Sequence, residues 1–181
     1  YGGVYRLMLG QKNIDKFYGE NCLDFEKLSI DNDLQPNEYV VMKADQQSQS
    51  AIGRYFKDEG KIKPIVNYRK VWNIQSKNKE QSFAIDALMQ PNIPLVTLTG
   101  IAGSGKTFLT LMAAMDGAMS KKFNRIIISR SIQTVGNDIG FLPGDLNEKM
   151  DPWLAPIKDN FQTMFNDITY FEAMKDKGQI E

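Results

Sequence analysis

Residues 1–70 alternate apolar and polar positions over short runs that turn residues separate. Between 38 and 43, for example, Val40 and Met42 face one side of the predicted chain while Lys43 faces the other. Such period-two alternation is typical of strands in a sheet, and Asp58 and Gly60 occur where a turn is needed. We therefore predict a small β-rich module with a short helix near 13–17 and strands at 5–9, 38–43, 50–56 and 61–66.

From about residue 71 the periodicity changes to alternating helices and strands. Apolar residues recur at helical spacing over 78–89 and again over 106–119, where few polar positions remain. A strand is predicted at 95–98, and a second at 125–129 contains the continuous run Ile126 to Ile128, which is typical of a strand covered on both faces. This pattern predicts an α/β fold with a mainly parallel sheet and right-handed crossovers. We divide the chain into a β-rich module, 1–70, and an α/β domain, 71–181.

Capping residues and prolines set the expected ends of the helices. Asn78 is a suitable N-cap for the helix over 78–89, and Pro91 closes that segment. A long loop follows the second strand, with glycines and a proline between 136 and 144. After it, Asp151 and Pro152 suit the N-cap and first turn of a further helix, which Pro156 should kink or restart.

Composition narrows the class of protein and the available chemistry. The 181 residues are 42% hydrophobic and 24% charged, which is typical of a globular domain. Lysine plus arginine equals aspartate plus glutamate at 22 each, so any nucleic-acid site must be local. Histidine is absent, which excludes histidine triads and histidine-ligated metals. A single cysteine, Cys22, and the lack of a membrane-spanning run or secretory leader predict a cytoplasmic protein.

A glycine-rich motif lies between the predicted strand at 95–98 and the predicted helix at 106–119. It satisfies the pattern G-x-x-x-x-G-K-[ST], called the P-loop or Walker A motif, in the strand–loop–helix setting that the mechanism requires. We predict that it binds ATP together with Mg²⁺. The motif consists of Gly100, Ile101, Ala102, Gly103, Ser104, Gly105, Lys106 and Thr107, and Phe108 follows it in the predicted nucleotide site.

Phosphate oxygens can be bound by backbone N–H groups of such a loop and by the positive end of the helix dipole. Lys106 would reach the β- and γ-phosphates and neutralise the charge that grows during phosphoryl transfer, and Thr107 would offer a hydroxyl to Mg²⁺. The alternative is a glycine-rich turn without a ligand. A lysine at a helix N-terminus is unfavourable to the dipole, however, which favours a bound anion.

The chain from residue 71 onward resembles the PhoH-like ATPase family, whose domain is similar to the core of superfamily 1 helicases. The resemblance rests on Trp72 to Ile74, on Asn78 to Gln81, on the segment 93–107, and on 140–153. It extends through 37–54, and in long members of the family this module follows an RNA-cleaving PIN domain. The resemblance implies a nucleotide-binding hydrolase that works on RNA, and a ring-shaped homo-oligomer as the parent assembly.

The resemblance also implies roles for residues outside the loop. Gln81 matches a glutamine that binds the adenine edge, although it could instead complete a capping-box arrangement three residues after Asn78. Arg130 and Ser131 match a motif that contacts a nucleic-acid backbone, with a structural ion pair at a strand end as the alternative. The loop at 136–145 either only turns the chain or contacts a subunit or nucleic acid.

The family predicts a later strand that ends in an acidic pair, which would hold Mg²⁺ through water and orient the attacking water. The chain stops at Glu181 before such a pair, so we expect a fragment with weak or no turnover whose parent hydrolyses ATP. Two alternatives stay open. One is a nucleotide-sensing or RNA-binding module without hydrolysis, and the other is a small-molecule kinase, for which no lid or phosphate-binding arginines are evident.

Overall fold

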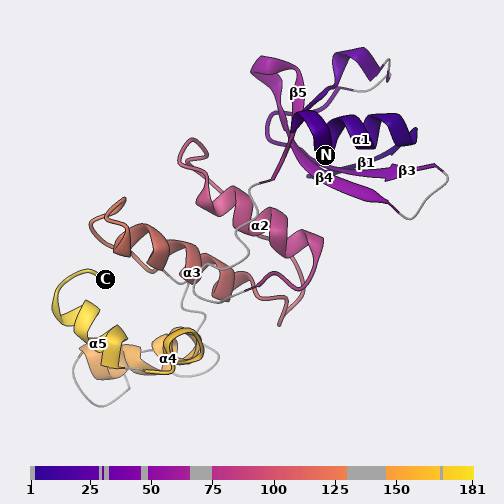
Figure 1. Cartoon of the computed structure of the whole chain (residues 1–181). Helices are drawn as coiled ribbons and strands as arrows, with labels where there is room; N and C mark the ends of the chain where they lie inside the picture. The colour runs from indigo at the N-terminus through magenta and orange to yellow at the C-terminus, as the bar shows by residue number, and fades with distance from the viewer. Residues whose placement is uncertain are drawn as a thin grey trace. The chain divides into compact units, whose positions relative to one another are not determined.

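The computed structural model describes residues 3–28, 30, 33–45, 49–65, 75–129, 146–167 and 169–181. The chain is a mixed α/β protein that divides into two compact units, Tyr1–Asn67 and Tyr68–Glu181 (Figure 1). A β-sheet forms the first unit, and helices dominate the second. Each unit is described by itself below.

The first unit is built on a five-stranded sheet with the strand order β1-β3-β4-β5-β2. β1 pairs with β3 in parallel, and the other neighbours pair in antiparallel fashion. The strands predicted from alternation are confirmed, whereas the two-residue β2 was missed because it is too short to show a period. The strands are β1 (Val4–Leu9), β2 (Leu23–Asp24), β3 (Tyr39–Ala44), β4 (Ser50–Phe56) and β5 (Lys61–Pro64).

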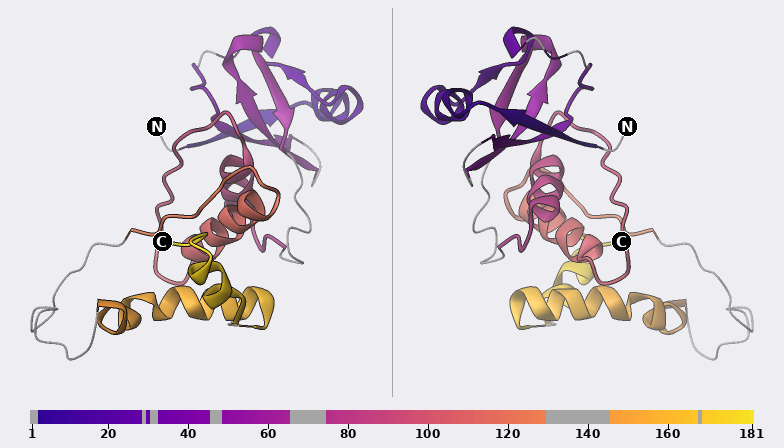
Figure 2. Two further views of the ribbon diagram at one scale, coloured as in Figure 1. Left: turned by 90° about the vertical axis from the view of Figure 1, so that its left-hand side faces the viewer. Right: turned by 90° about the vertical axis from the view of Figure 1, so that its right-hand side faces the viewer.

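Helix α1 (Gln11–Glu20) covers one face of this sheet and is longer than the helix predicted at 13–17 (Figure 2). Its Ile14 and Phe17 are fully buried, and they pack on apolar side chains of the strands. The turns η1 (Glu26–Leu28) and η2 (Lys57–Glu59) are single 3-10 turns. The strand residues that share this core are Leu7, Leu9, Val40, Met42, Ala44, Ala51, Tyr55 and Ile62.

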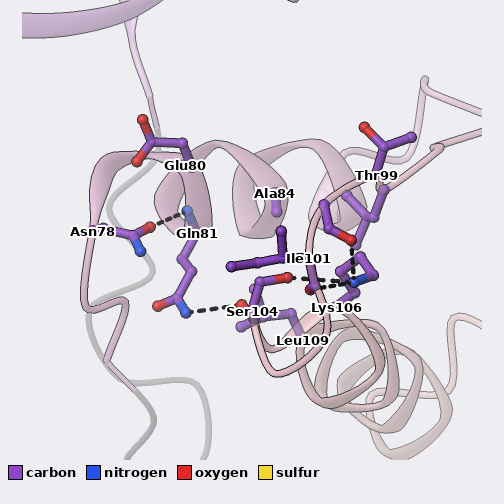
Figure 3. Close-up of a pocket in the computed structure, with 11 residues that line it drawn as sticks. Asn78, Glu80, Gln81, Ala84, Thr99, Ile101, Ser104, Lys106 and Leu109 are labelled. Carbon is purple, nitrogen blue, oxygen red and sulfur yellow. Dashed lines mark hydrogen bonds between the residues drawn. The ribbon is translucent and has the colours of Figure 1, made fainter.

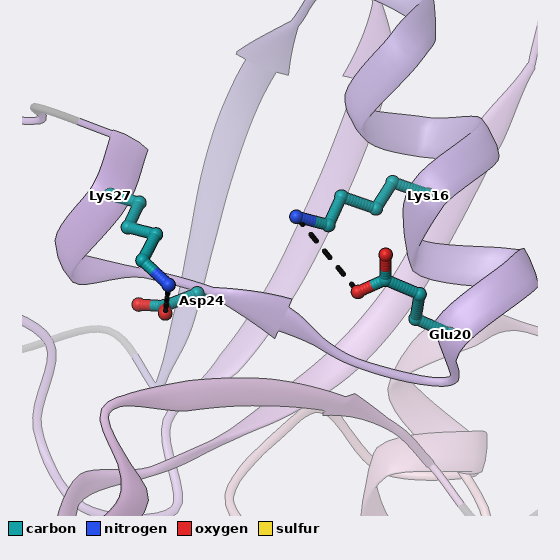
Figure 4. Close-up of polar contacts among 4 residues, drawn as sticks. All are labelled: Lys16, Glu20, Asp24 and Lys27. Atoms are coloured by element: carbon teal, nitrogen blue, oxygen red, sulfur yellow. Dashed lines mark ion pairs between the residues drawn. The ribbon is translucent and has the colours of Figure 1, made fainter.

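Ion pairs lie on the surface of the first unit (Figure 4). Lys27 lies 2.7 Å from Asp24, and Lys16 lies 3.9 Å from Glu20 within α1. The hydrogen bond from Lys27 holds the pKa of the Asp24 carboxyl below its usual value. Exposed pairs of this kind contribute little to stability. The unit is therefore stabilised mainly by the apolar side chains that are buried between α1 and the sheet.

The second unit contains the helices α2 (Lys79–Met89), α3 (Lys106–Met119), α4 (Leu146–Phe165) and α5 (Thr169–Asp176). The predicted α2 and α3 are confirmed, and the side chain of Asn78 caps α2 as expected. Ile85 of α2 packs with Leu109 and Met112 of α3, and Met164 of α4 joins them. A second cluster joins the other side of α3 to α4 and α5 through Leu111, Met115, Ile157, Phe161, Phe171 and Met174.

The two strands predicted for this unit are not formed as expected. Residues 95–98 form no strand, and Leu95 is 81% exposed. The run at 125–129 is reduced to one parallel bridge, from Ile126 to Ile180. Backbone hydrogen bonds of 2.7–3.0 Å join 126–128 to 179–181. An apolar run becomes a strand only where a neighbour satisfies its backbone groups, and among the described residues of the second unit only this short ladder does so.

The predicted start and kink of the following helix were wrong. α4 begins at Leu146 and continues without a break through Asp151, Pro152 and Pro156, so Asp151 is not an N-cap. A proline in a helix removes one backbone hydrogen bond. Ile157 and Phe161, which follow Pro156, are buried against Leu111 and Met115, and this packing keeps the helix continuous.

Candidate functional site

The glycine-rich loop at 100–107 adopts backbone angles that favour glycine. Gly100, Gly103 and Gly105 have φ values of 151°, 76° and 89°. Residues with a Cβ rarely adopt these conformations, because the Cβ collides with the neighbouring carbonyl group. Gly105 is also the N-cap of α3. The loop therefore requires its glycines for backbone geometry, and it delivers the chain directly into a helix.

The first turn of α3 directs unpaired backbone donors out of the helix N-terminus. Leu109 N–H donates to the Gly105 carbonyl at 2.9 Å, which is the first intrahelical bond. The N–H groups of Lys106, Thr107 and Phe108 precede it and have no carbonyl within the helix to bind. No acidic residue occurs in this first turn, and Lys106 adds a positive charge to it. The end of α3 is thus suited to a negative ligand.

The ammonium group of Lys106 turns back over the loop (Figure 3). Its Nζ donates to the carbonyl oxygens of Gly100 and Ile101, each at 2.8 Å, and lies 3.4 Å from Ser104 Oγ. These partners are neutral oxygen atoms, so no carboxylate of the described residues compensates the charge of the lysine. The side chain is held at the loop and is half-buried there.

Gln81 of α2 reaches the same loop from the opposite side. Its backbone N–H donates to Asn78 Oδ1 at 2.8 Å, which is the N-cap bond. Its side-chain Oε1 accepts from Lys77 N–H at 2.8 Å, and its Nε2 donates to the Ser104 carbonyl at 3.3 Å (Figure 3). The amide therefore ties the start of α2 to the glycine-rich loop.

Gln81 lines two of the cavities that adjoin the loop among the described residues. The first, of about 380 Å³, contains Thr99, Ser104 and Lys106. The second, of about 460 Å³, lies beside Gly103, Gly105 and Phe108 and is completed by Gln75, Lys77 and Thr163. The loop thus borders one cavity at Lys106 and a further cavity large enough for a ring system.

The remaining predicted residues lie in different surroundings. Thr107 is exposed at the start of α3 and lines a third cavity of about 440 Å³ together with Ser129. Phe108 packs partly against Leu109 and Met112. Arg130 and Ser131 lie outside the described residues, as does the loop at 136–145. Thr163 of α4 was not predicted, because nothing in the sequence indicates that a residue so far along the chain returns to the loop.

Two kinds of feature are absent from the described residues. They contain no group of three or more histidine, cysteine, aspartate or glutamate side chains that could hold a metal ion. Over the same ranges, no helix has the length and apolar character needed to cross a membrane.

A comparison with known protein families shows to which family this chain belongs. The model of the family described as PhoH-like protein matches residues 73–181, which contain the loop, both cavities and Gln81. The chain belongs to the PhoH-like family. The matched residues include the glycine-rich loop at the N-terminus of α3.

Curated PhoH-like relatives extend the similarity into the first unit. Protein PhoH2 of Bacillus subtilis strain 168 is 37% identical over 172 residues, which are 92% of this chain and 38% of that protein. Protein PhoH2 of Thermobispora bispora is 33% identical over 134 residues, 73% of this chain and 30% of that protein. The chain thus spans 30% to 38% of the length of these relatives. No solved structure matches the chain.

Proposed function

We propose that this chain binds a nucleoside triphosphate, ATP with Mg²⁺, on the P-loop formed by residues 100–107. One observation carries the proposal: a loop with left-handed glycines enters α3 directly, and Lys106 is the first residue of that helix. A lysine at this position opposes the helix dipole unless an anion is bound.

The donor groups at the loop fit a phosphate chain. The first-turn N–H groups of α3 have no helical acceptor, and within the described ranges the ammonium of Lys106 bonds only to neutral oxygen atoms of Gly100, Ile101 and Ser104. Phosphate oxygens are stronger acceptors for an ammonium than carbonyl oxygens are, because they are charged. Lys106 would therefore transfer from the loop carbonyls to the phosphates, where it neutralises charge on the γ-phosphoryl group.

Thr107 would hold Mg²⁺ through its hydroxyl oxygen. Mg²⁺ prefers oxygen ligands and keeps several waters, so that one hydroxyl and the phosphates of the nucleotide make a suitable set. The exposed side chain of Thr107 fits that role. The ion would supply charge neutralisation between the phosphates.

The base would occupy the cavity of about 460 Å³ beside the loop. Gln81 can bind an adenine edge because each end of its amide has unused capacity: Nε2 has a second N–H, and Oε1 has a second lone pair. Phe108 lines the same cavity and would contact the base or the ribose. These features support ATP over triphosphates without a 6-amino group.

For the intact protein we propose Mg²⁺-dependent ATP hydrolysis coupled to work on RNA, within a ring of like subunits and in the cytoplasm. Membership of the PhoH-like family supports this proposal. Arg130 and Ser131, just after the 125–129 segment, would contact the nucleic-acid backbone, since an arginine and a hydroxyl suit phosphate oxygens.

The binding proposal is tested with a fluorescent ATP analogue titrated against the wild-type chain and Lys106→Ala. We expect saturable, Mg²⁺-dependent binding by the wild-type chain and loss of most of that affinity in the variant. Equal affinity of the two proteins would refute the assignment of the loop.

The base preference is tested by competition of ATP and GTP against the same analogue. Gln81→Ala should reduce the discrimination between the two nucleotides, because the amide can no longer read the 6-position of the purine. Unchanged discrimination would leave Gln81 without a role in base recognition.

A further inference from the structure

The side chain of Gln81 lies against one peptide group of the loop, the one between Ser104 and Gly105. Gln81 Nε2 donates to the Ser104 carbonyl at 3.3 Å. A Cβ on Gly105 would lie 3.4 Å from the same Nε2 atom. The glutamine amide therefore binds the carbonyl half of this peptide group and also lies close to Gly105.

The geometry of the peptide group determines the direction of the Gly105 N–H. In a planar trans peptide the carbonyl and the N–H point in opposite directions. Because the Ser104 carbonyl is turned toward Gln81, the Gly105 N–H is turned away from it. That N–H has no hydrogen-bond acceptor within the described residues. It immediately precedes the unpaired N–H groups of the first turn of α3.

We infer that Gln81 is a positioning residue for phosphate binding, which holds the Ser104–Gly105 peptide so that the Gly105 N–H is directed at the phosphates. The inference rests on the proposed nucleotide site and goes beyond base recognition. It predicts that Gln81 affects ligands that carry no base at all.

The other end of the amide makes this action rigid. Gln81 Oε1 accepts from Lys77 N–H at 2.8 Å, while its backbone N–H is bound to Asn78 Oδ1 at 2.8 Å. The side chain is therefore fixed at both ends, to the segment before α2 and to the loop. A fixed donor loses less conformational entropy when it orients the peptide.

The test compares ATP with inorganic tripolyphosphate, which has the phosphates and lacks the base. Both ligands compete with the fluorescent ATP analogue for the wild-type chain and for Gln81→Met, which keeps the length of the side chain but cannot hydrogen-bond through an amide. We expect both ligands to bind the variant about fivefold to tenfold more weakly, as expected for one lost hydrogen bond.

Two further variants separate positioning from a general loosening of α2. Ser82→Ala removes the 2.8 Å bond from Ser82 Oγ to Ser76 Oγ in the same turn, away from the loop, and should leave both affinities unchanged. Gln81→Glu can still accept from Lys77 N–H but, when ionised, cannot donate to the Ser104 carbonyl. It should therefore bind tripolyphosphate no more tightly than Gln81→Met does.

The outcomes discriminate between the two proposals. If Gln81→Met weakens ATP but not tripolyphosphate, Gln81 acts on the base alone and the positioning role is overturned, while the nucleotide site stands. Restoration of tripolyphosphate binding by Gln81→Glu, or an equal loss in Ser82→Ala, would also overturn it. If the wild-type chain binds neither ligand, the nucleotide site itself is wrong.

Discussion

The Nζ atom of Lys106 lies 2.8 Å from the carbonyl oxygen of Gly100, the residue that opens the glycine-rich loop. The lysine at one end of the loop thus closes it on the glycine at the other end. Loss of this hydrogen bond should change the free energy of unfolding little, because both partners lie near the surface and water can replace either one. Little free energy would therefore be needed for the ammonium to leave the Gly100 carbonyl and bind a phosphate.

This arrangement predicts how the nucleotide changes thermal stability. A ligand at a hundred times its dissociation constant stabilises the native state by about 2.7 kcal/mol, which raises the Tm by several degrees in a chain of this length. Mg²⁺-ATP should produce this shift in the wild-type chain and not in Lys106→Ala, whose Tm without ligand should match the wild type. Differential scanning fluorimetry measures both values. A full ligand-induced shift in the variant would contradict the role of Lys106.

Thr107→Val tests the metal ligand, since valine has nearly the shape of threonine without the hydroxyl. The wild-type chain should bind ATP more tightly with Mg²⁺ than with EDTA. In the variant, the factor by which Mg²⁺ raises the affinity for ATP should be about fivefold smaller, which corresponds to about 1 kcal/mol. The affinity of the variant in EDTA should equal that of the wild-type chain. Isothermal titration in the two buffers gives all four affinities. An equal Mg²⁺ effect in both proteins would exclude Thr107 as the ligand.

Gly53→Ala probes the packing of the first unit. A Cβ at this position in β4 would lie 2.6 Å from Ile62 Cγ2 and 2.8 Å from the Lys63 carbonyl oxygen. Overpacking of this kind should lower the free energy of unfolding by about 1–3 kcal/mol. Gly19→Ala in α1 is the matched control, because nothing lies within 4 Å of the added Cβ, and it should stabilise by about 0.5–1 kcal/mol. Urea denaturation compares the two, and equal effects would show that the sheet is looser than described.

Asp167→Asn tests the pH dependence of stability at the start of α5. Hydrogen bonds from the Thr169 hydroxyl at 2.7 Å and the Thr169 N–H at 2.9 Å hold the pKa of the Asp167 carboxyl below its usual value. A lowered pKa stabilises the folded state above the unfolded pKa, and this contribution is lost as the pH falls through the folded pKa. The Tm should therefore fall slightly more in the wild-type chain than in the variant between about pH 6 and about pH 3. Parallel curves would contradict the prediction.

The elements that the sequence predicted well are those that local chemistry determines. The glycine-rich motif requires a helix directly after it, and α3 begins there. α2 begins where Asn78 can cap it. The strands of the first unit alternate clearly enough for β1, β3, β4 and β5 to be placed. The single bridge at Ile126 and the unbroken α4 could not be predicted in this way, because each depends on a partner distant in the sequence.

The sequence by itself determined the glycine-rich loop, the lysine that follows it and the family of the chain, because these depend on residue type and local spacing. Only the tertiary structure decided which groups meet at that loop. The bond from Gln81 to the Ser104 carbonyl and the presence of Thr163 beside Phe108 arise from the packing of α2 and α4 against α3. That packing follows from burial of apolar side chains on several helices at once, which no local pattern encodes.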